Sequence, residues 1–162
     1  LFVTLFVFSG LGDSVYAALG GLASLGVLVS MLASWTFGQM VDRHRGGMLL
    51  SAGTIVNAVI HVFRPFVTSG AGVVGVNIAS ETATSAYVMP FTRVMFDVAD
   101  SSGFRITYLM YIEMTGCIGA ALSCAVLALS VSALGVKEGM VAAFIIAAAY
   151  ELILLVARRA AR

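Results

Sequence analysis

The chain has 162 residues, of which 60% are hydrophobic and 10% are charged, and its formal net charge is +1. Soluble domains carry about 25% charged residues and about 45–50% apolar ones, so this composition excludes an ordinary soluble domain and indicates that the chain lies in a lipid bilayer. The near-neutral balance also excludes nucleic acid as a partner, because a nucleic-acid-binding surface concentrates positive charge on one face.

In chain order, the apolar segments predict helices that cross a membrane, each of which needs about 20 mostly apolar residues. The first apolar stretch, about 1–10, is too short and starts without Met, so we interpret it as the end of a truncated helix in a piece of a longer protein. Glycine, proline and charged residues then separate five longer apolar segments. The sequence therefore predicts an all-α membrane protein with full spans at about 16–40, 47–66, 71–96, 106–132 and 140–157.

The basic residues between these segments predict how the helices are oriented, because Lys and Arg are retained on the cytoplasmic side of a membrane. When successive helices alternate in direction, most arginines fall on one side, and only Arg64 and Lys137 fall on the other. We therefore predict a multi-pass protein of the plasma membrane, in a bacterium the inner membrane, with a cytoplasmic C-terminus. The arginines on the predicted cytoplasmic side are Arg43, Arg45, Arg105, Arg158, Arg159 and Arg162, with Arg93 close to them.

The segment FGQMVDRHRGG, residues 37–47, places charged residues between the first two predicted spans. Its pattern, Gly38-x-x-x-Asp42-Arg43-x-Arg45, resembles the loop signature of the major facilitator superfamily (MFS) of transporters, which follows the second helix of each six-helix half. The small-residue-rich segment at 21–46 also resembles the helix that leads into this loop in the family. Where the family usually has a second glycine, this chain has Arg45, followed by two glycines.

The resemblance implies the C-terminal half of an MFS-type helical bundle, truncated in its first helix, with a missing N-terminal half as its partner. It also implies a secondary transporter that moves a small-molecule substrate by alternating access, which we expect to be coupled to protons. In such a protein Asp42 would form contacts in one conformation that break in another, and Gly38 would allow close approach of two helices. The alternative is a simple positively charged anchor whose charge Asp42 partly neutralises.

The acids Asp97 and Asp100 follow the third predicted span, in a predicted loop at 97–105. The resemblance implies an acidic partner for the loop arginines at this place, so we expect Asp97 to pair with Arg43 or Arg45. The alternatives are that both acids keep a loop solvated, or that their D-x-x-D spacing belongs to a metal-dependent transferase. The transferase reading is weak because no further acidic residues stand nearby.

Polar residues within the spans are candidates for a transport pathway, because ionisable groups at membrane depth are costly unless they face a partner or a wet cavity. Glu81 lies about 15 Å from the outer start of its helix, close to mid-bilayer, where transporters bind their substrates. Asn77, Glu81 and Thr84 share one helix face. We interpret them as a stripe that faces a cavity, with an interhelical hydrogen-bond network as the alternative.

Two further spans carry candidate groups. In the fourth, Glu113 either carries a transported proton or ties two helices together, near Gly116 and Gly119, which suit close helix contact. In the second, Asn57 and His61 belong to a polar stripe, and His61 either relays protons or packs against a neighbouring helix. Glu151, near the end of the fifth span, is expected to reach the interface or to bond to a neighbour.

The competing functions are a non-transporting multi-pass scaffold or assembly protein, in which buried polar groups only specify packing, and an intramembrane enzyme. The sequence contains no Gly-x-Ser-x-Gly, no His-Glu-x-x-His and no set of metal-ligand residues, the motifs that indicate hydrolases and metalloenzymes. We therefore predict no enzymatic activity, no metal and no cofactor.

Overall fold

The computed structural model describes residues 14–159, and the predicted helix stub at 1–10 lies outside these residues. The described chain is almost entirely helical and contains no strand. Short 3-10 helices at Arg64–Phe66 and Ile153–Arg159 follow the second and fifth helices. The five long helices are α1 (Ser14–Asp42), α2 (Gly46–Phe63), α3 (Gly70–Ser101), α4 (Arg105–Leu134) and α5 (Val136–Leu152).

Four helical segments in this part of the chain are long and apolar enough to cross a membrane: α1, α2 with its 3-10 extension, α4, and α5 with its extension. The structure is therefore that of a helical membrane protein. Helix α3 has 32 residues, which is sufficient length for a span, but it carries more polar side chains than the other four.

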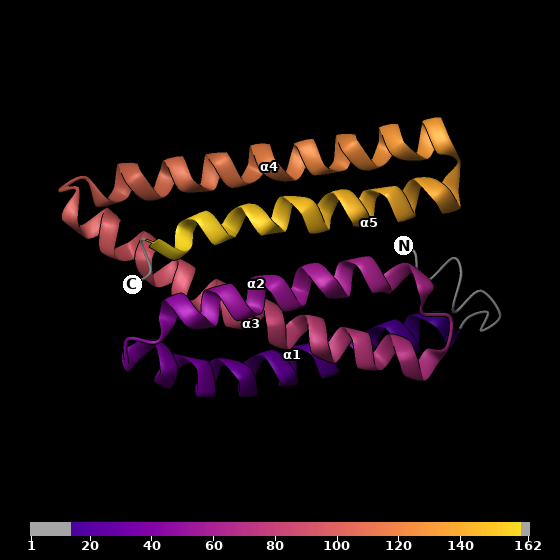
Figure 1. The fold of residues 1–162 in the computed structure, drawn as a ribbon, viewed down its shortest axis with the longest axis horizontal. Helices are drawn as coiled ribbons and strands as arrows, with labels where there is room; N and C mark the ends of the chain where they lie inside the picture. Colours follow the sequence, from indigo (N-terminus) through magenta and orange to yellow (C-terminus); the bar gives the residue numbers. More distant parts are fainter. Residues whose placement is uncertain (1–13, 160–162) are drawn as a thin grey trace.

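The helices lie side by side with α2 at the centre (Figure 1). Helix α2 packs against α3 on one side and α5 on the other, α1 packs against α3, and α4 lies along α5 at the edge of the bundle. The largest fully buried side chains, Leu50, Thr54 and Pro90, come from α2 and α3. Helix α4 has no buried residue, so the core lies between α1, α2, α3 and α5.

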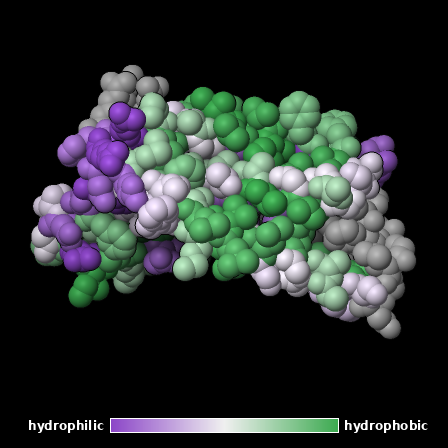
Figure 2. Space-filling view, turned by 90° about the horizontal axis from the view of Figure 1, so that it is seen from below, coloured by the Kyte–Doolittle hydropathy of each residue, from purple (hydrophilic) through white to green (hydrophobic). Residues whose placement is uncertain are grey.

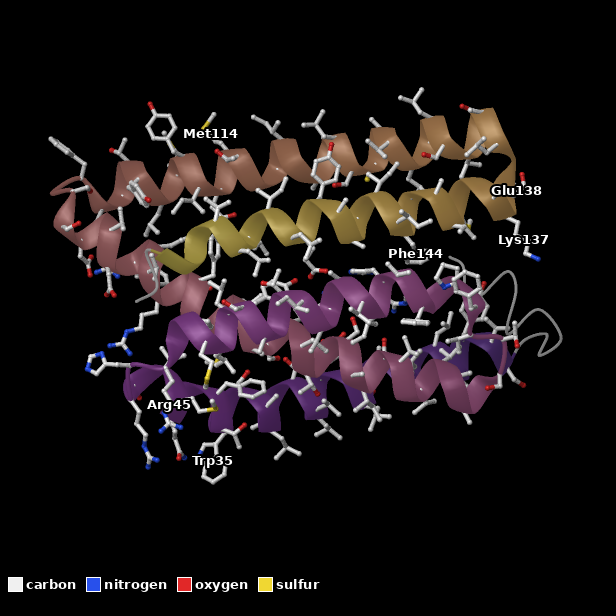
Figure 3. All side chains as sticks on the ribbon, in the orientation of Figure 1. Trp35, Arg45, Met114, Lys137, Glu138 and Phe144 are labelled. Carbon is white, nitrogen blue, oxygen red and sulfur yellow. The ribbon has the colours of Figure 1, made fainter. Side chains whose placement is uncertain are left out.

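One end of the bundle collects the connection between α1 and α2, the connection between α3 and α4, and the end of α5 (Figure 1). We call it the arginine end, because Arg43 and Arg45 lie in the first of these connections and Arg105 is the first residue of α4. Hydrophilic side chains gather at this end and an apolar surface covers the middle of the bundle (Figure 2). Lys137 and Glu138 lie at the opposite end (Figure 3). Arg43, Arg45 and Arg105 thus lie at the end of the bundle opposite to Lys137, as the sequence predicts.

Helix α3 is longer at the arginine end than the sequence predicts. It continues to Ser101, five residues past the predicted end at 96, so Asp97 and Asp100 lie on its last turns and not in a loop. Ala99 is 0% exposed, and this packing holds the last turns in place. The predicted loop at 97–105 is reduced to residues 102–104, where Gly103 has a φ of 73°, a conformation that glycine adopts readily.

Helix α2 approaches α3 closely at Gly53. A Cβ atom there would lie 2.8 Å from the carbonyl oxygen of Ala83 and 2.9 Å from the Cβ of Ala86, so only glycine fits against α3. By contrast, a Cβ at Gly38, Gly116 or Gly119 would meet nothing within 4 Å. The close helix contacts expected at these three glycines are therefore not formed between the described residues.

Candidate functional site

The connection between α1 and α2 is a tight helix end. Asp42 is the last residue of α1, and α2 begins at Gly46. The backbone N–H of Arg45 donates to the carbonyl oxygen of Met40 at 3.1 Å. His44 has a φ of 59°, in the left-handed region that commonly ends a helix but favours Gly or Asn. This turn leaves the Asp42 side chain exposed and directed to solvent or to another helix.

Arg93 of α3 is the residue that Asp42 contacts. Its Nη1 atom donates to Oδ1 of Asp42 at 2.9 Å, and its Nε atom lies 4.0 Å from Oδ2 of Asp97 one helical turn later. The structure thus corrects the expected pairing, because Asp97 lies beside Arg93 and not beside Arg43 or Arg45. The Arg93 side chain is 46% exposed and those of Asp42 and Asp97 are 80% and 74% exposed. We call these three residues the hinge cluster.

The second acid of the predicted loop has a local role. Oδ1 of Asp100 lies 3.2 Å from Nε of Arg105, and the Arg105 guanidinium lies over the ring of Phe96, 5.8 Å from its centre. These contacts join the end of α3 to the start of α4. Asp100 therefore holds the short connection between the two helices and does not contact the α1–α2 turn.

A groove of about 690 Å³ runs between α1 and α3, and Asn77 and Glu81 lie in its wall. Gly26 lies opposite them, and a Cβ atom there would lie 3.4 Å from Nδ2 of Asn77 and 3.4 Å from Cγ of Glu81. Ser30 and Ser34 of α1 also line the groove. The structure thus places two of the three predicted stripe residues together, whereas Thr84 does not line the groove and interacts with Tyr87 instead.

A second polar site joins α2, α3 and α5 in the interior. Asn57, 2% exposed, donates a short hydrogen bond from Nδ2 to Oε1 of Glu151 and accepts one from the hydroxyl of Ser80 at 3.1 Å. Nε2 of His61 lies 3.7 Å from Oε2 of Glu151. The Glu151 side chain is 8% exposed. We call Asn57, His61, Ser80 and Glu151 the buried cluster.

The buried cluster is not fully hydrogen-bonded. Among the side chains of residues 14–156, the buried atoms without a hydrogen-bond partner are Oγ1 of Thr54, Nδ1 of His61 and Oε2 of Glu151. The side chain of Tyr87 also interacts with the Glu151 carboxylate. Unpaired buried polar atoms are rare in native proteins and usually have a reason. Here two of them belong to the two ionisable residues of the cluster.

His61 also lies in the wall of a cavity of about 590 Å³ between α4 and α5, lined mostly by apolar residues. Its ring stacks against Phe144, with 6.2 Å between the ring centres. The guanidinium of Arg64 lies 5.9 Å from the centre of the same ring. Phe144 is directed from α5 toward α2 (Figure 3). His61 therefore lies between the apolar cavity on one side and Glu151 on the other.

The remaining candidates lie apart from these sites. Glu113 is exposed on α4 and belongs neither to the groove nor to the buried cluster. The sequence did not predict Glu151, Ser80 or Arg93 as site residues. For Glu151 a signal was present, because it is an acid within an otherwise apolar segment and lies at a depth similar to that of Asn57. For Arg93 the signal was its place one turn before Asp97 on the same helix.

None of the family models, curated proteins or solved structures compared with the chain matches it. In the part of the chain that the structure describes, no group of three or more His, Cys, Asp or Glu residues is placed to hold a metal ion. The functional interpretation therefore depends on three features: the hinge cluster, the groove with Glu81, and the buried cluster around Glu151.

Proposed function

We propose that the chain forms one half of a secondary transporter of the MFS type, which moves a small solute across the plasma membrane by alternating access. The groove between α1 and α3 carries this proposal. Glu81 and Asn77 lie in its wall, and Glu81 lies about 16 Å along α3 from Gly70, near mid-membrane. A carboxyl group at that depth costs several kcal/mol in lipid, so the groove must face water, substrate or a second helical half.

The hinge cluster supports the same function. Exposed ion pairs contribute only about 0–1 kcal/mol each, so the contact between Asp42 and Arg93 can break without unfolding a helix. It joins the end of α1 to α3, the two helices that form the groove. Breaking and remaking this contact would let α1 move relative to α3 and change which side of the groove is open. A transporter needs both arrangements to be populated.

The test is proton and solute movement in vesicles that contain the full-length protein. A trapped pH-sensitive dye reports proton entry when a hexose, an amino acid, a dicarboxylate or an organic cation is added in turn. We expect one class of solute to drive proton movement in the unmodified protein, and Glu81→Gln to reduce it at least tenfold. Glu138→Gln, the same substitution at the exposed start of α5, should leave it unchanged. The proposal fails if no solute class moves protons above the level of protein-free vesicles.

A scaffold or assembly protein is the second candidate function. The observation that favours it is the bonding of the buried cluster, in which Asn57, Ser80 and Glu151 join three helices. Such a network specifies packing whether or not anything is transported. Under this alternative Glu81→Gln would have no effect in vesicles, and the unmodified protein would move no solute.

A further inference from the structure

We propose that His61 and Glu151 form a proton-binding site between α2, α3 and α5, separate from the groove that contains Glu81. The binding of the proton is independent of what the protein transports. Its role as the site that couples protons to transport rests on the proposed function.

The geometry of Glu151 carries this proposal. One carboxylate oxygen, Oε1, accepts a hydrogen bond from Asn57, whereas Oε2 is buried and makes no hydrogen bond of normal length, with the Tyr87 side chain as its other polar neighbour. The nearest base to Oε2 is Nε2 of His61, at 3.7 Å. An N–H···O hydrogen bond needs a separation of about 2.7–3.2 Å, so a shift of less than about 1 Å brings the two atoms into bonding range. Neutral histidine carries its proton on one ring nitrogen only, and a further proton at Nε2 or Oε2 supplies a donor between these two atoms whichever nitrogen that is.

The charge balance of the site favours proton uptake. A proton from water adds to Nε2 of His61 or to Oε2 of Glu151, no bond between heavy atoms changes, and the pair passes from one negative charge to neutral. An unneutralised charge in a membrane interior is unfavourable. Because the two atoms lie 3.7 Å apart, the proton can reside on either residue.

The other ionisable groups around the pair leave this negative charge largely uncompensated. From the α2 side, Arg64 interacts electrostatically with His61 but also with Glu81. From α3, Tyr87 interacts with Glu151 and is neutral at ordinary pH. Among the described residues, no ionisable side chain of α4 contacts Glu151, and Glu113 is exposed on that helix. Asn57 and Tyr87 bind the Glu151 carboxylate without cancelling its charge, so a proton is what would neutralise it.

The His61 side of the site is more exposed than the Glu151 side. The His61 side chain is 20% exposed, compared with 8% for Glu151, and it lies in the wall of the cavity between α4 and α5. Histidine titrates near neutral pH and exchanges protons readily. His61 therefore lies where it can receive a proton first, with Glu151 behind it.

The buried cluster also connects this site to the groove. Asn57 bonds to Glu151 with its amide nitrogen and to Ser80 with its amide oxygen, and Ser80 precedes Glu81 in α3. Protonation of Glu151 weakens its hydrogen bond from Asn57, because a charged acceptor binds more strongly than a neutral one. A change at Glu151 is thereby transmitted to the residue next to Glu81.

The experiment measures proton binding by the full-length protein in lipid nanodiscs, in a His44→Gln background because His44 is the only other histidine in the chain. Infrared difference spectra between about pH 5 and pH 8, the range in which histidine titrates, are recorded with carbon-13-labelled glutamate. A pH indicator counts the protons bound. We expect both His61→Gln and Glu151→Gln to lose about one bound proton per chain and to alter the labelled carboxyl band.

Glu138→Gln on the same helix should leave both readouts unchanged, because its side chain is exposed at the start of α5. Gln at 151 still offers an oxygen to Asn57, and His61→Gln tests the same site without altering the carboxylate. The proposal is overturned if both variants bind as many protons as the background protein. If the variants lose a bound proton but the unmodified protein moves no solute in the vesicle test, the proton site stands and the transport proposal fails. If the protein moves solute but neither variant loses a bound proton, the transport proposal stands and the proton site fails.

Discussion

The groove and the buried cluster are two polar regions at similar depth, and they differ in what covers them. Both draw on α3, where Ser80 and Glu81 are neighbours in the chain but lie about 100° apart around the helix. Ser80 is buried and bonded to Asn57 of α2, whereas Glu81 lies in the wall of an open groove against α1. The same helix thus closes one side of the bundle and leaves the other side open.

The difference arises from the helix that faces α3 on each side. On the closed side, Gly53 allows α2 to approach so closely that no side chain fits between the helices. On the open side, Gly26 removes a side chain from α1 opposite Asn77 and Glu81. Glycine therefore has opposite consequences at the two sites. It tightens the packing where the polar groups bond to one another, and it leaves space where they face the groove.

The largest expected effect is a difference in the free energy of unfolding between variants of Asn57 and variants of Asn77. Asn57→Ala removes the hydrogen-bonding partner of both Glu151 and Ser80, and breaking a buried charged network costs about 3–5 kcal/mol. Asn77→Ala in the groove has no such partner to lose and should cost less than about 1 kcal/mol. Unfolding by denaturant in mixed micelles compares the two variants. Equal losses of stability would mean that the two regions do not differ as described.

Much of the fold follows from the sequence because long apolar segments determine which residues become helices. The five predicted spans correspond to α1–α5, and the distribution of arginines predicts which helix ends lie together. The end of α3 was placed too early, at 96, because Asp97, Asp100 and two serines resemble a loop in composition. Burial of Ala99 and the contact between Asp100 and Arg105 extend the helix, and these tertiary contacts are not visible in the local sequence.

The sites were only partly predictable, because helical periodicity identifies residues on one face but not the helix that they meet. The spacing of Asn77 and Glu81 predicts a shared face, and both line the groove, but Thr84 does not. The stripe of Asn57 and His61 was identified without its partner Glu151, which is 94 residues away from Asn57 in the chain. Arg93 was placed near the cytoplasmic arginines without a partner, although its contact with Asp42 joins two helices.

The next largest expected effect is a difference in stability between alanine variants of Gly53 and Gly26. Gly53→Ala places a Cβ 2.8 Å from a backbone oxygen of α3, and such overpacking costs about 1–3 kcal/mol. Gly26→Ala meets its nearest atoms at 3.4 Å, and these belong to the flexible side chains of Asn77 and Glu81. It should be neutral or stabilising by up to about 1 kcal/mol, because alanine favours the helix. Thermal unfolding in detergent measures both, and a greater loss at Gly26 would contradict the difference in packing.

The smallest expected effect concerns the hinge cluster, which lies outside both regions but joins the helices of the groove. Asp42→Asn removes a contact between exposed side chains, and we expect a loss of less than about 1 kcal/mol, further reduced at 1 M salt, where the screening length falls to about 3 Å. Asp100→Asn, which weakens the contact with Arg105, is the matched control of similar stability. In vesicles, only Asp42→Asn should slow solute movement, because Asp42 joins α1 to α3 while Asp100 joins α3 to α4. If both variants slow solute movement equally, or if neither slows it, the hinge cluster does not control the opening of the groove.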